Sequence, residues 1–244
     1  MKRNDLPEFL FKNIPRFDIY PENVSPVSEM CKTTAFFPGG QGLWLENGEN
    51  DISPEILVLG QDFSTVDYHK ELLSGQGKKD IDFPTWRNLI KLLKVDAKID
   101  LNRCFFSNVF MDLRSDGKMT GRFPGFKDAE YVKRSVENLL FQIVTIKPKV
   151  IITLGMFAAD MLSMTGAQEL ADFKNGEVLK IKDEGLKLDV NINGNVCTVV
   201  ALEHPSMRFL NVKRRKFQKF EGDEAEVEML KEVTKTPPQI LFRK

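Results

Sequence analysis

The chain has 244 residues, of which 42% are hydrophobic, so it can bury a full core as one large domain and its composition does not suggest disorder. Its 35 basic and 35 acidic residues cancel, which argues against a protein that coats nucleic acid with global positive charge but allows a local basic patch. The polar residues 1–5 begin no apolar segment of signal-peptide or membrane length, so we expect a cytoplasmic monomer without membrane contact.

The N-terminal fifty residues are rich in turn-forming residues, among them Pro15, Pro21, Pro26 and the segment Pro38-Gly39-Gly40-Gln41-Gly42. We therefore interpret residues 1–50 as an irregular extension packed on a single domain that spans residues 1–244. A hairpin around residues 43–45 is one option within this extension.

Four short apolar runs follow and are separated by segments with helical periodicity, at residues 56–59, 104–109, 150–154 and 196–202. This alternation is typical of a mainly parallel sheet covered by helices on both faces. We therefore predict a three-layer α/β/α domain with a central four-stranded sheet. The periodicity predicts helices over residues 84–93, 128–146 and 156–164, and the second helix ends before Pro148 because proline disfavours a preceding helical residue.

The three cysteines, Cys31, Cys104 and Cys197, lie far apart and form none of the close pairs that zinc or iron-sulfur sites use. We expect reduced, mostly buried thiols, and neither a metal nor another cofactor.

Polar residues follow each predicted strand, and in open α/β sheets catalytic side chains lie just beyond the carboxyl ends of strands. This rule selects four places: Gln61-Asp62, Asn108 with Asp112 and Arg114, Gly155, and His204-Pro205-Ser206. Taken singly, each place is explained at least as well by a turn, a helix cap or a structural histidine. Their occurrence at the ends of successive strands favours a common site.

The segments Leu59-Gly60-Gln61-Asp62 and Glu203-His204-Pro205-Ser206, with Asn108 and the strand of residues 147–155 between them, resemble the uracil-DNA glycosylase superfamily. The similarity covers roughly residues 53–219. It implies a metal-independent DNA glycosylase of base-excision repair, which hydrolyses the bond between sugar and base after a damaged base, expected to be uracil, is flipped out of single- or double-stranded DNA.

The resemblance also implies roles for individual residues. Asp62 would position the attacking water and stabilise the cationic sugar, while His204 would donate a hydrogen bond to the departing base. The amide of Asn108 would read the edge of uracil, beside Gln61. Phe63 and Phe83 are candidates for stacking on the base, although each is a core residue by default, and we prefer Phe83 because it immediately precedes a helix.

Residues 207–210 correspond to the loop that wedges into the duplex in relatives, which makes Met207 and Arg208 expected DNA contacts together with Ser206. The basic run that follows would contact phosphates through Lys213, Arg214 and Arg215. Without the neighbouring His204, the same run would be interpreted as a solvated helix face.

The sequence departs from the best-known relatives directly after Asp62. They have Pro-Tyr-His there, in which the tyrosine excludes the methyl group of thymine, whereas this chain has Phe63-Ser64-Thr65 and a longer loop at residues 74–79. Tyr68-His69 lies downstream, but a helix beginning near Thr65 would turn those rings away. Two alternatives therefore stay open: an inactive binding protein on the same fold, and a hydrolase of free nucleosides or nucleotides.

Overall fold

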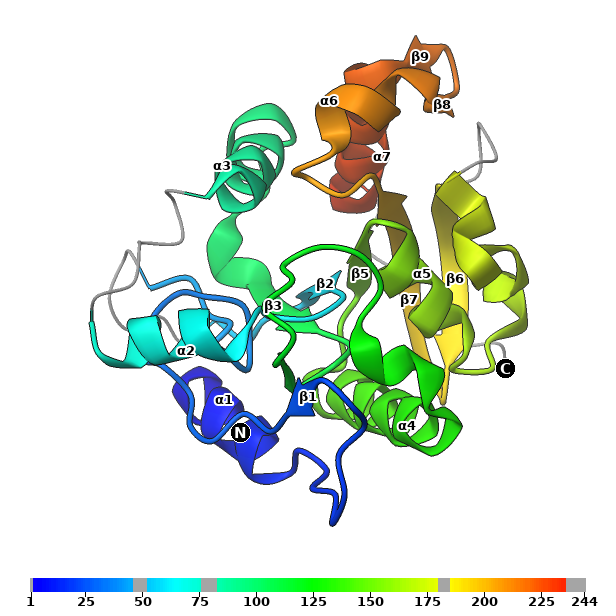
Figure 1. Ribbon diagram of the computed structural model, residues 1–244. Helices are drawn as coiled ribbons and strands as arrows, with labels where there is room; N and C mark the ends of the chain where they lie inside the picture. Colours follow the sequence, from blue (N-terminus) through cyan, green and yellow to red (C-terminus); the bar gives the residue numbers. More distant parts are fainter. Residues whose placement is uncertain (1, 46–51, 76–82, 180–184, 236–244) are drawn as a thin grey trace.

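A computed structural model describes residues 2–45, 52–75, 83–179 and 185–235 (Figure 1). The part of the expected loop extension at residues 76–79 lies outside these ranges. No helix within them is both long and apolar enough to span a membrane.

The centre of the molecule is a five-stranded sheet with the order β3-β2-β5-β7-β6 (Figure 1). Strands β2 (Ile56–Gly60), β3 (Cys104–Asn108), β5 (Val150–Leu154) and β7 (Asn195–Leu202) are parallel to one another and coincide with the four predicted runs. Their residues are almost all buried, because helices cover both faces of the sheet and leave no solvent-facing side for polar residues.

The predicted number of strands was too low by one, because β6 (Leu186–Ile192) pairs antiparallel with β7 at the edge of the sheet. The first four residues of this strand are partly or fully exposed, Leu188 among them, and buried and exposed residues alternate only from Val190 onward, after a register shift. The turn between the two strands contains Asn193 and Gly194, both at positive φ. An Asn-Gly pair between two strands is a strong hairpin signal, which sequence reasoning overlooked.

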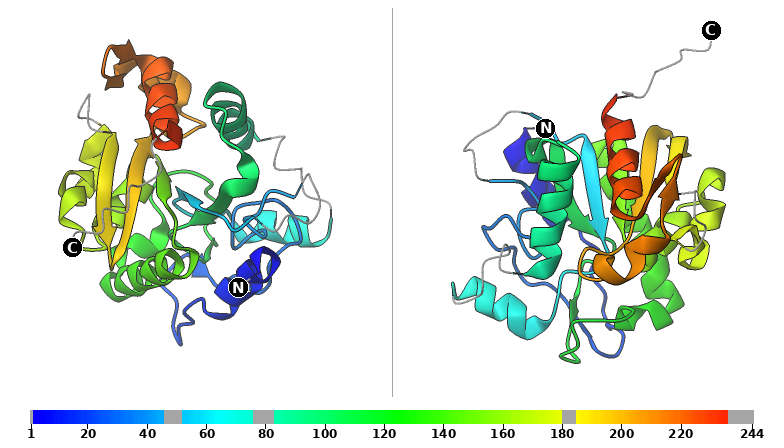
Figure 2. Two further views of the ribbon diagram at one scale, coloured as in Figure 1. Left: turned by 180° about the vertical axis from the view of Figure 1, so that it is seen from behind. Right: turned by 90° about the horizontal axis from the view of Figure 1, so that it is seen from above.

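Two sets of helices form the outer layers (Figures 1 and 2). One face of the sheet packs against α1 (Leu6–Lys12), α4 (Ala129–Ile146), α5 (Met156–Ser163) and the 3-10 turns of Gln168–Leu179. The other face packs against α3 (Pro84–Ile90), its π-helical continuation Lys91–Asp96, and α7 (Gly222–Lys235). The three-layer α/β/α architecture is thus confirmed, and the three predicted helices coincide with α3, α4 and α5.

The ends of α4 show why this helix was predictable. Asp128 is its N-cap and accepts a hydrogen bond from the backbone N–H of Tyr131 at 2.9 Å. Lys147 ends the helix in a left-handed conformation, directly before Pro148.

The N-terminal residues 2–45 contribute to the hydrophobic cores on both faces of the sheet, through α1 on one face and Trp44 on the other. They also hold β1 (Val24–Ser25), which pairs antiparallel with β4 (Leu113–Arg114). Leu43 forms an isolated antiparallel bridge with Phe105 of β3. The cysteine side chains are all buried.

The remaining elements are short. They are α2 (Val66–Leu73), α6 (Arg208–Asn211), the hairpin of β8 (Lys216–Phe217) and β9 (Phe220–Glu221), and 3-10 turns at Arg3–Asp5, Leu101–Arg103, Pro124–Lys127 and Val212–Arg214.

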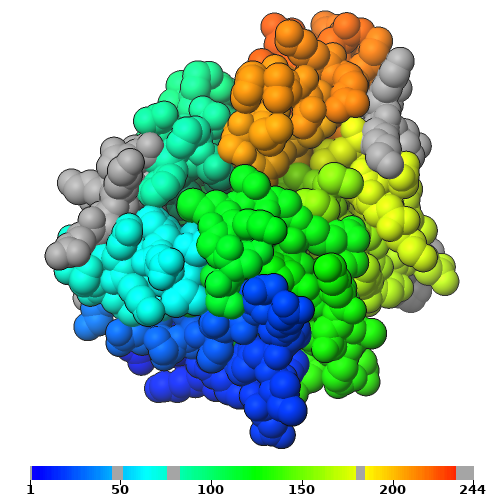
Figure 3. Space-filling view, viewed as in Figure 1, coloured from blue at the N-terminus to red at the C-terminus, as the bar shows by residue number. Residues whose placement is uncertain are grey.

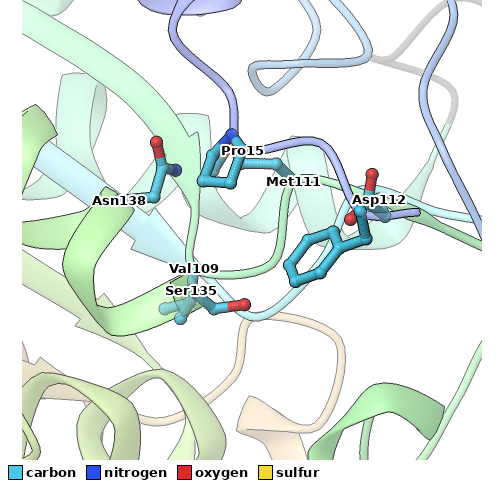
Figure 4. Close-up of a pocket in the computed structure, with 7 residues that line it drawn as sticks. Pro15, Val109, Met111, Asp112, Ser135 and Asn138 are labelled. Atoms are coloured by element: carbon cyan, nitrogen blue, oxygen red, sulfur yellow. The ribbon is translucent and has the colours of Figure 1, made fainter. Parts of the chain in front are cut away.

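A small cavity of about 10 Å³ lies between the N-terminal segment and α4, with Asp112, Ser135 and Asn138 in its wall (Figure 4). It has room for about one water molecule. Asp112 accepts a hydrogen bond from the Tyr131 hydroxyl at 2.9 Å, and burial raises the pKa of the Asp112 carboxyl to about 6. Asp112 follows the second strand as expected, but it belongs to this structural cluster.

Candidate active site

A cavity of about 800 Å³ opens at the carboxyl ends of the parallel strands (Figure 3). The hollow lies between α3, the α6 region and the segment that follows β4. Each of the four strand ends contributes a residue to its wall: Asp62, Asn108, Gly155 and His204. The structure thus brings together side chains that are up to 142 positions apart in the sequence.

Asp62 is held by a buried arginine that the strand-end rule selected but to which sequence reasoning gave no role. Arg114 Nε donates to Asp62 Oδ1 at 2.9 Å, and Arg114 Nη2 donates to Asp62 Oδ2 at 2.9 Å. The two side chains are 2% and 8% exposed, so little water screens this bidentate pair. Asp62 therefore has one fixed orientation at the cavity wall.

Gln61 was expected to bind the base, but its amide is occupied within the protein. Its Nε2 donates to Asp62 Oδ2 and to the Gly121 carbonyl, both at 3.0 Å, and its Oε1 accepts from the backbone N–H of Phe123 at 3.0 Å. An amide nitrogen has two hydrogens, so no donor is left for a ligand. Gln61 instead fixes Asp62 against the segment after β4.

Asn108 is buried at the end of β3, where it lies next to Gly60 of the neighbouring strand β2. Its Nδ2 donates to the Phe37 carbonyl at 3.0 Å, which fixes the orientation of the amide and leaves one N–H and the Oδ1 for other partners. A Cβ atom on Gly60 would lie 2.6 Å from Asn108 Oδ1, so glycine is needed there for this close approach.

His204 follows β7, and its ring is held in one tautomer by the residues after it. The Ser206 backbone N–H donates to His204 Nδ1 at 3.4 Å, and the Ser206 hydroxyl lies 2.8 Å from the same nitrogen. With Nδ1 as acceptor, the proton of the neutral ring is on Nε2. Burial lowers the pKa of His204 below its usual value, although the negative charge of Asp62 opposes that shift.

The segment that carries His204 is also fixed from outside. Asn88 of α3 donates from Nδ2 to the Pro205 carbonyl at 2.9 Å. Gly155 has φ of 80° and ψ of 173°, and a Cβ atom there would lie 3.0 Å from the Cβ of His204. This backbone conformation is essentially restricted to glycine, so the close approach of β5 to His204 depends on it.

Aromatic rings form one wall of the cavity, and both predicted stacking residues line it. Phe83 contacts Tyr68 edge-on, with ring centroids 5.2 Å apart, while Phe63 lies against Gly39 and 5.8 Å from the Tyr68 ring. The expectation that Tyr68 would turn away was wrong. Helix α2 does begin after Thr65, but Tyr68 lies at the start of the helix and lines the cavity.

The ring of His69 does turn away from the cavity, as expected, whereas an aromatic ring that was not predicted lines it. His69, the neighbour of Tyr68, is 2% exposed and does not line the cavity. Phe36 does line it, packed edge-on against Trp86 at 5.3 Å, and was missed because it falls in the proline-rich N-terminal segment.

The expected DNA contacts divide into two groups. Met207 and Phe209 are 45% and 68% exposed, and Lys213 and Arg214 are exposed beside them. Ser206, Met207 and Arg214 line the cavity. The cavity mouth thus combines an apolar tip with nearby positive charge.

Two further expected DNA contacts, Arg208 of the wedge segment and Arg215 of the basic run, are instead bound within the protein. Arg215 is fully buried and donates to the carbonyls of Val178 and Ala201 at 3.2 and 2.8 Å. Arg208 donates from Nε to Glu226 Oε2 at 2.8 Å and is also paired with Asp223. Glu226 of α7 is fully buried, so it requires cationic partners inside the protein.

Among the described residues, no group of three or more His, Cys, Asp or Glu side chains is placed to bind a metal ion.

Comparison with known proteins gives one family. The model of the uracil DNA glycosylase superfamily matches residues 48–227, which include all five strands of the sheet and every residue of the cavity wall named above except Phe36. No curated protein matches the chain.

Proposed function

Because the chain belongs to the uracil-DNA glycosylase superfamily, we propose that it is a DNA glycosylase that hydrolyses the bond between deoxyribose and a damaged base held in the cavity. The expected base is uracil. The observation that carries the proposal is that Asp62, Asn108 and His204 line one cavity, each with an orientation fixed by hydrogen bonds.

The lone pairs of Asp62 indicate how it would act on water. Oδ2 accepts from both Arg114 Nη2 and Gln61 Nε2, whereas Oδ1 accepts only from Arg114 Nε among the described residues. Each carboxylate oxygen has two lone pairs, so Oδ1 retains one that can accept a proton from a water molecule. That water would attack the sugar carbon as the base departs.

His204 would act at the other end of the breaking bond. Negative charge develops on the departing base, and a neutral imidazole with its proton on Nε2 can donate a hydrogen bond to the base oxygen where that charge accumulates. The lowered pKa of His204 favours this neutral form at physiological pH. A donor of this kind contributes about 10²- to 10³-fold to the rate.

Asn108 would select the base. Its free N–H and Oδ1 present a donor beside an acceptor, which complements the acceptor and donor on the edge of uracil and mismatches cytosine. Since the other N–H is bound to the Phe37 carbonyl, the amide cannot rotate to accept the opposite pattern without losing that hydrogen bond.

A second candidate function is an inactive protein that binds DNA through the same cavity. The Arg114–Asp62 pair favours it, because a guanidinium that neutralises the carboxylate weakens its attraction for a cationic sugar. The two candidates share the binding surface and differ only in chemistry.

The test is release of free base from single- and double-stranded oligonucleotides that contain uracil, hypoxanthine or xanthine. We expect Asp62→Asn to lower the rate by about 10²- to 10⁴-fold and His204→Ala by about 10²- to 10³-fold. Asp67→Asn is the matched control, because Asp67 is exposed on α2 and does not line the cavity.

Each outcome distinguishes the candidates. Binding without release of any deaminated base would support the inactive protein. Release from free deoxyuridine but not from DNA would instead support a nucleoside hydrolase.

A further inference from the structure

The segment of residues 115–122, which joins β4 to the 3-10 turn Pro124–Lys127, forms one rim of the cavity (Figures 1 and 3). Its residues Met119, Thr120 and Gly121 line the cavity, and Met119 is 59% exposed. A large apolar side chain that is exposed at the mouth of a cavity indicates a binding surface, whereas single exposed apolar residues elsewhere on a protein are common. We refer to residues 115–122 as the rim loop.

The rim loop is anchored by hydrogen bonds directly behind Met119. Arg114 donates from Nη1 to the Thr120 carbonyl at 3.2 Å and from Nη2 to the Gly121 carbonyl at 2.8 Å. At the end of the loop, Arg122 is paired with the buried Asp160 at 2.8 Å, and its guanidinium lies 3.7 Å from the Phe126 ring centroid. These contacts hold the apolar side chain of Met119 on a fixed base, so less order has to be gained on binding.

The opposite rim carries a second set of exposed apolar side chains, Met207, Phe209 and Leu210. A nucleotide that leaves a DNA stack exposes the apolar faces of its neighbours on both sides, and side chains that fill or cover them stabilise the extruded state. Lys118 on the rim loop and Lys213 and Arg214 across the cavity are exposed, which suits a phosphate backbone running past both rims.

We propose that the rim loop is a second DNA-contacting element, in which Met119 packs on the nucleotide next to the extruded one, across the cavity from Met207. The inference rests on the proposed function, since it requires DNA at this cavity. It adds a DNA-contacting surface next to β4. Arg114, which holds Asp62, also anchors this surface.

Methionine oxidation offers a direct footprint of this contact. Dilute hydrogen peroxide oxidises exposed methionines, and mass spectrometry follows each sulfoxide separately. The protein is treated with and without a duplex that carries a tetrahydrofuran abasic site. Met119 and Met207 are expected to oxidise at least about fivefold more slowly with DNA, whereas Met164, which is 38% exposed and does not line the cavity, should not change.

The outcomes separate this inference from the proposed function. Protection of Met207 without protection of Met119 would overturn the inference alone. Protection of neither would overturn it together with DNA binding at the cavity, and the base-release assay independently reports whether the catalytic proposal survives.

Substitution gives a second measurement on the same duplex. Met119→Ala should raise the dissociation constant by about fivefold to twentyfold, since it removes most of the apolar area that would be buried. Met119→Leu restores that area and should bind within about twofold of the unmodified protein, as should the control Met164→Ala. Equal affinity of Met119→Ala and Met164→Ala would refute the contact.

Discussion

The buried Arg114–Asp62 pair is the feature whose perturbation is most informative. Arg114→Gln removes the charge and the fork of donors, and it leaves the Asp62 side chain, which is 8% exposed, without its cationic partner. Breaking a buried pair by removing one partner costs about 3 to 5 kcal/mol. Because Gln61 still donates to Asp62 and the carboxylate borders the cavity, we expect a loss near the lower end, about 3 kcal/mol of unfolding free energy.

Activity should fall along with stability, for a separate reason. Without the bidentate contact, Asp62 can rotate away from the orientation that places Oδ1 toward water, and a misplacement of about 1 Å costs on the order of 10²-fold in rate. Arg114→Lys separates the two effects, because it keeps the charge but offers no planar fork. It should recover much of the stability and little of the rate of base release.

Urea unfolding of the single variants Arg114→Gln and Asp62→Asn, and of the double variant, measures the coupling between the two residues. We expect a coupling energy above about 1.5 kcal/mol, as for contacting residues in one buried network. The reasoning is refuted if Arg114→Gln unfolds within about 0.5 kcal/mol of the unmodified protein and the coupling vanishes.

Four further variants test other parts of the structure. Burial raises the pKa of Asp112 to about 6 from an ordinary 3.8, so its stabilising contribution is complete below about pH 4 and is lost as the pH rises through 6. Between pH 4 and 7, the unfolding free energy of Asp112→Asn should therefore rise by up to about 3 kcal/mol relative to that of the unmodified protein, measured by urea unfolding. Parallel plots of unfolding free energy against pH for the two proteins would contradict this. Gly155→Ala should lower the unfolding free energy by about 1 to 3 kcal/mol and slow base release, because a side chain at φ 80° is strained and pushes on His204; an unchanged rate would show that His204 tolerates the shift. Lys213→Ala should weaken DNA binding, measured by fluorescence anisotropy, and should reduce the slope of log affinity against log salt concentration by about one counterion. Arg215→Met should unfold more easily because Arg215 is buried, and the folded variant should keep the slope of the unmodified protein.

The central strands and the position of the site could be predicted because buried parallel strands leave continuous apolar runs in the sequence. The polar residues that end those runs necessarily meet at one edge of the sheet, and this is why Asp62, Asn108 and His204 were identified together. Local signals also predicted α4, from its cap at Asp128 to its end before Pro148.

What could not be predicted depends on contacts between distant segments. Arg114 and Asp62 are 52 positions apart, and nothing near either residue indicates the pairing. Arg215 looks like its exposed neighbours Lys213 and Arg214. It turns inward because of partners that are distant in sequence, namely the buried Glu226 on α7 and the carbonyls of Val178 and Ala201. Edge strand β6 was a different kind of omission, because Asn193-Gly194 did signal it.

The Arg114–Asp62 pair also changes how much Asp62 and His204 are each expected to contribute to catalysis. The Coulomb attraction between charges falls with the inverse of distance, so a guanidinium about twice as far from the sugar as the carboxylate would cancel roughly half of the attraction that Asp62 offers a cationic sugar. Asp62 would then contribute mainly by orienting water through Oδ1, while His204 forms no ion pair within the described part of the chain that would oppose its hydrogen bond to the base. The loss caused by Asp62→Asn should accordingly lie toward the lower end of its range and approach that of His204→Ala.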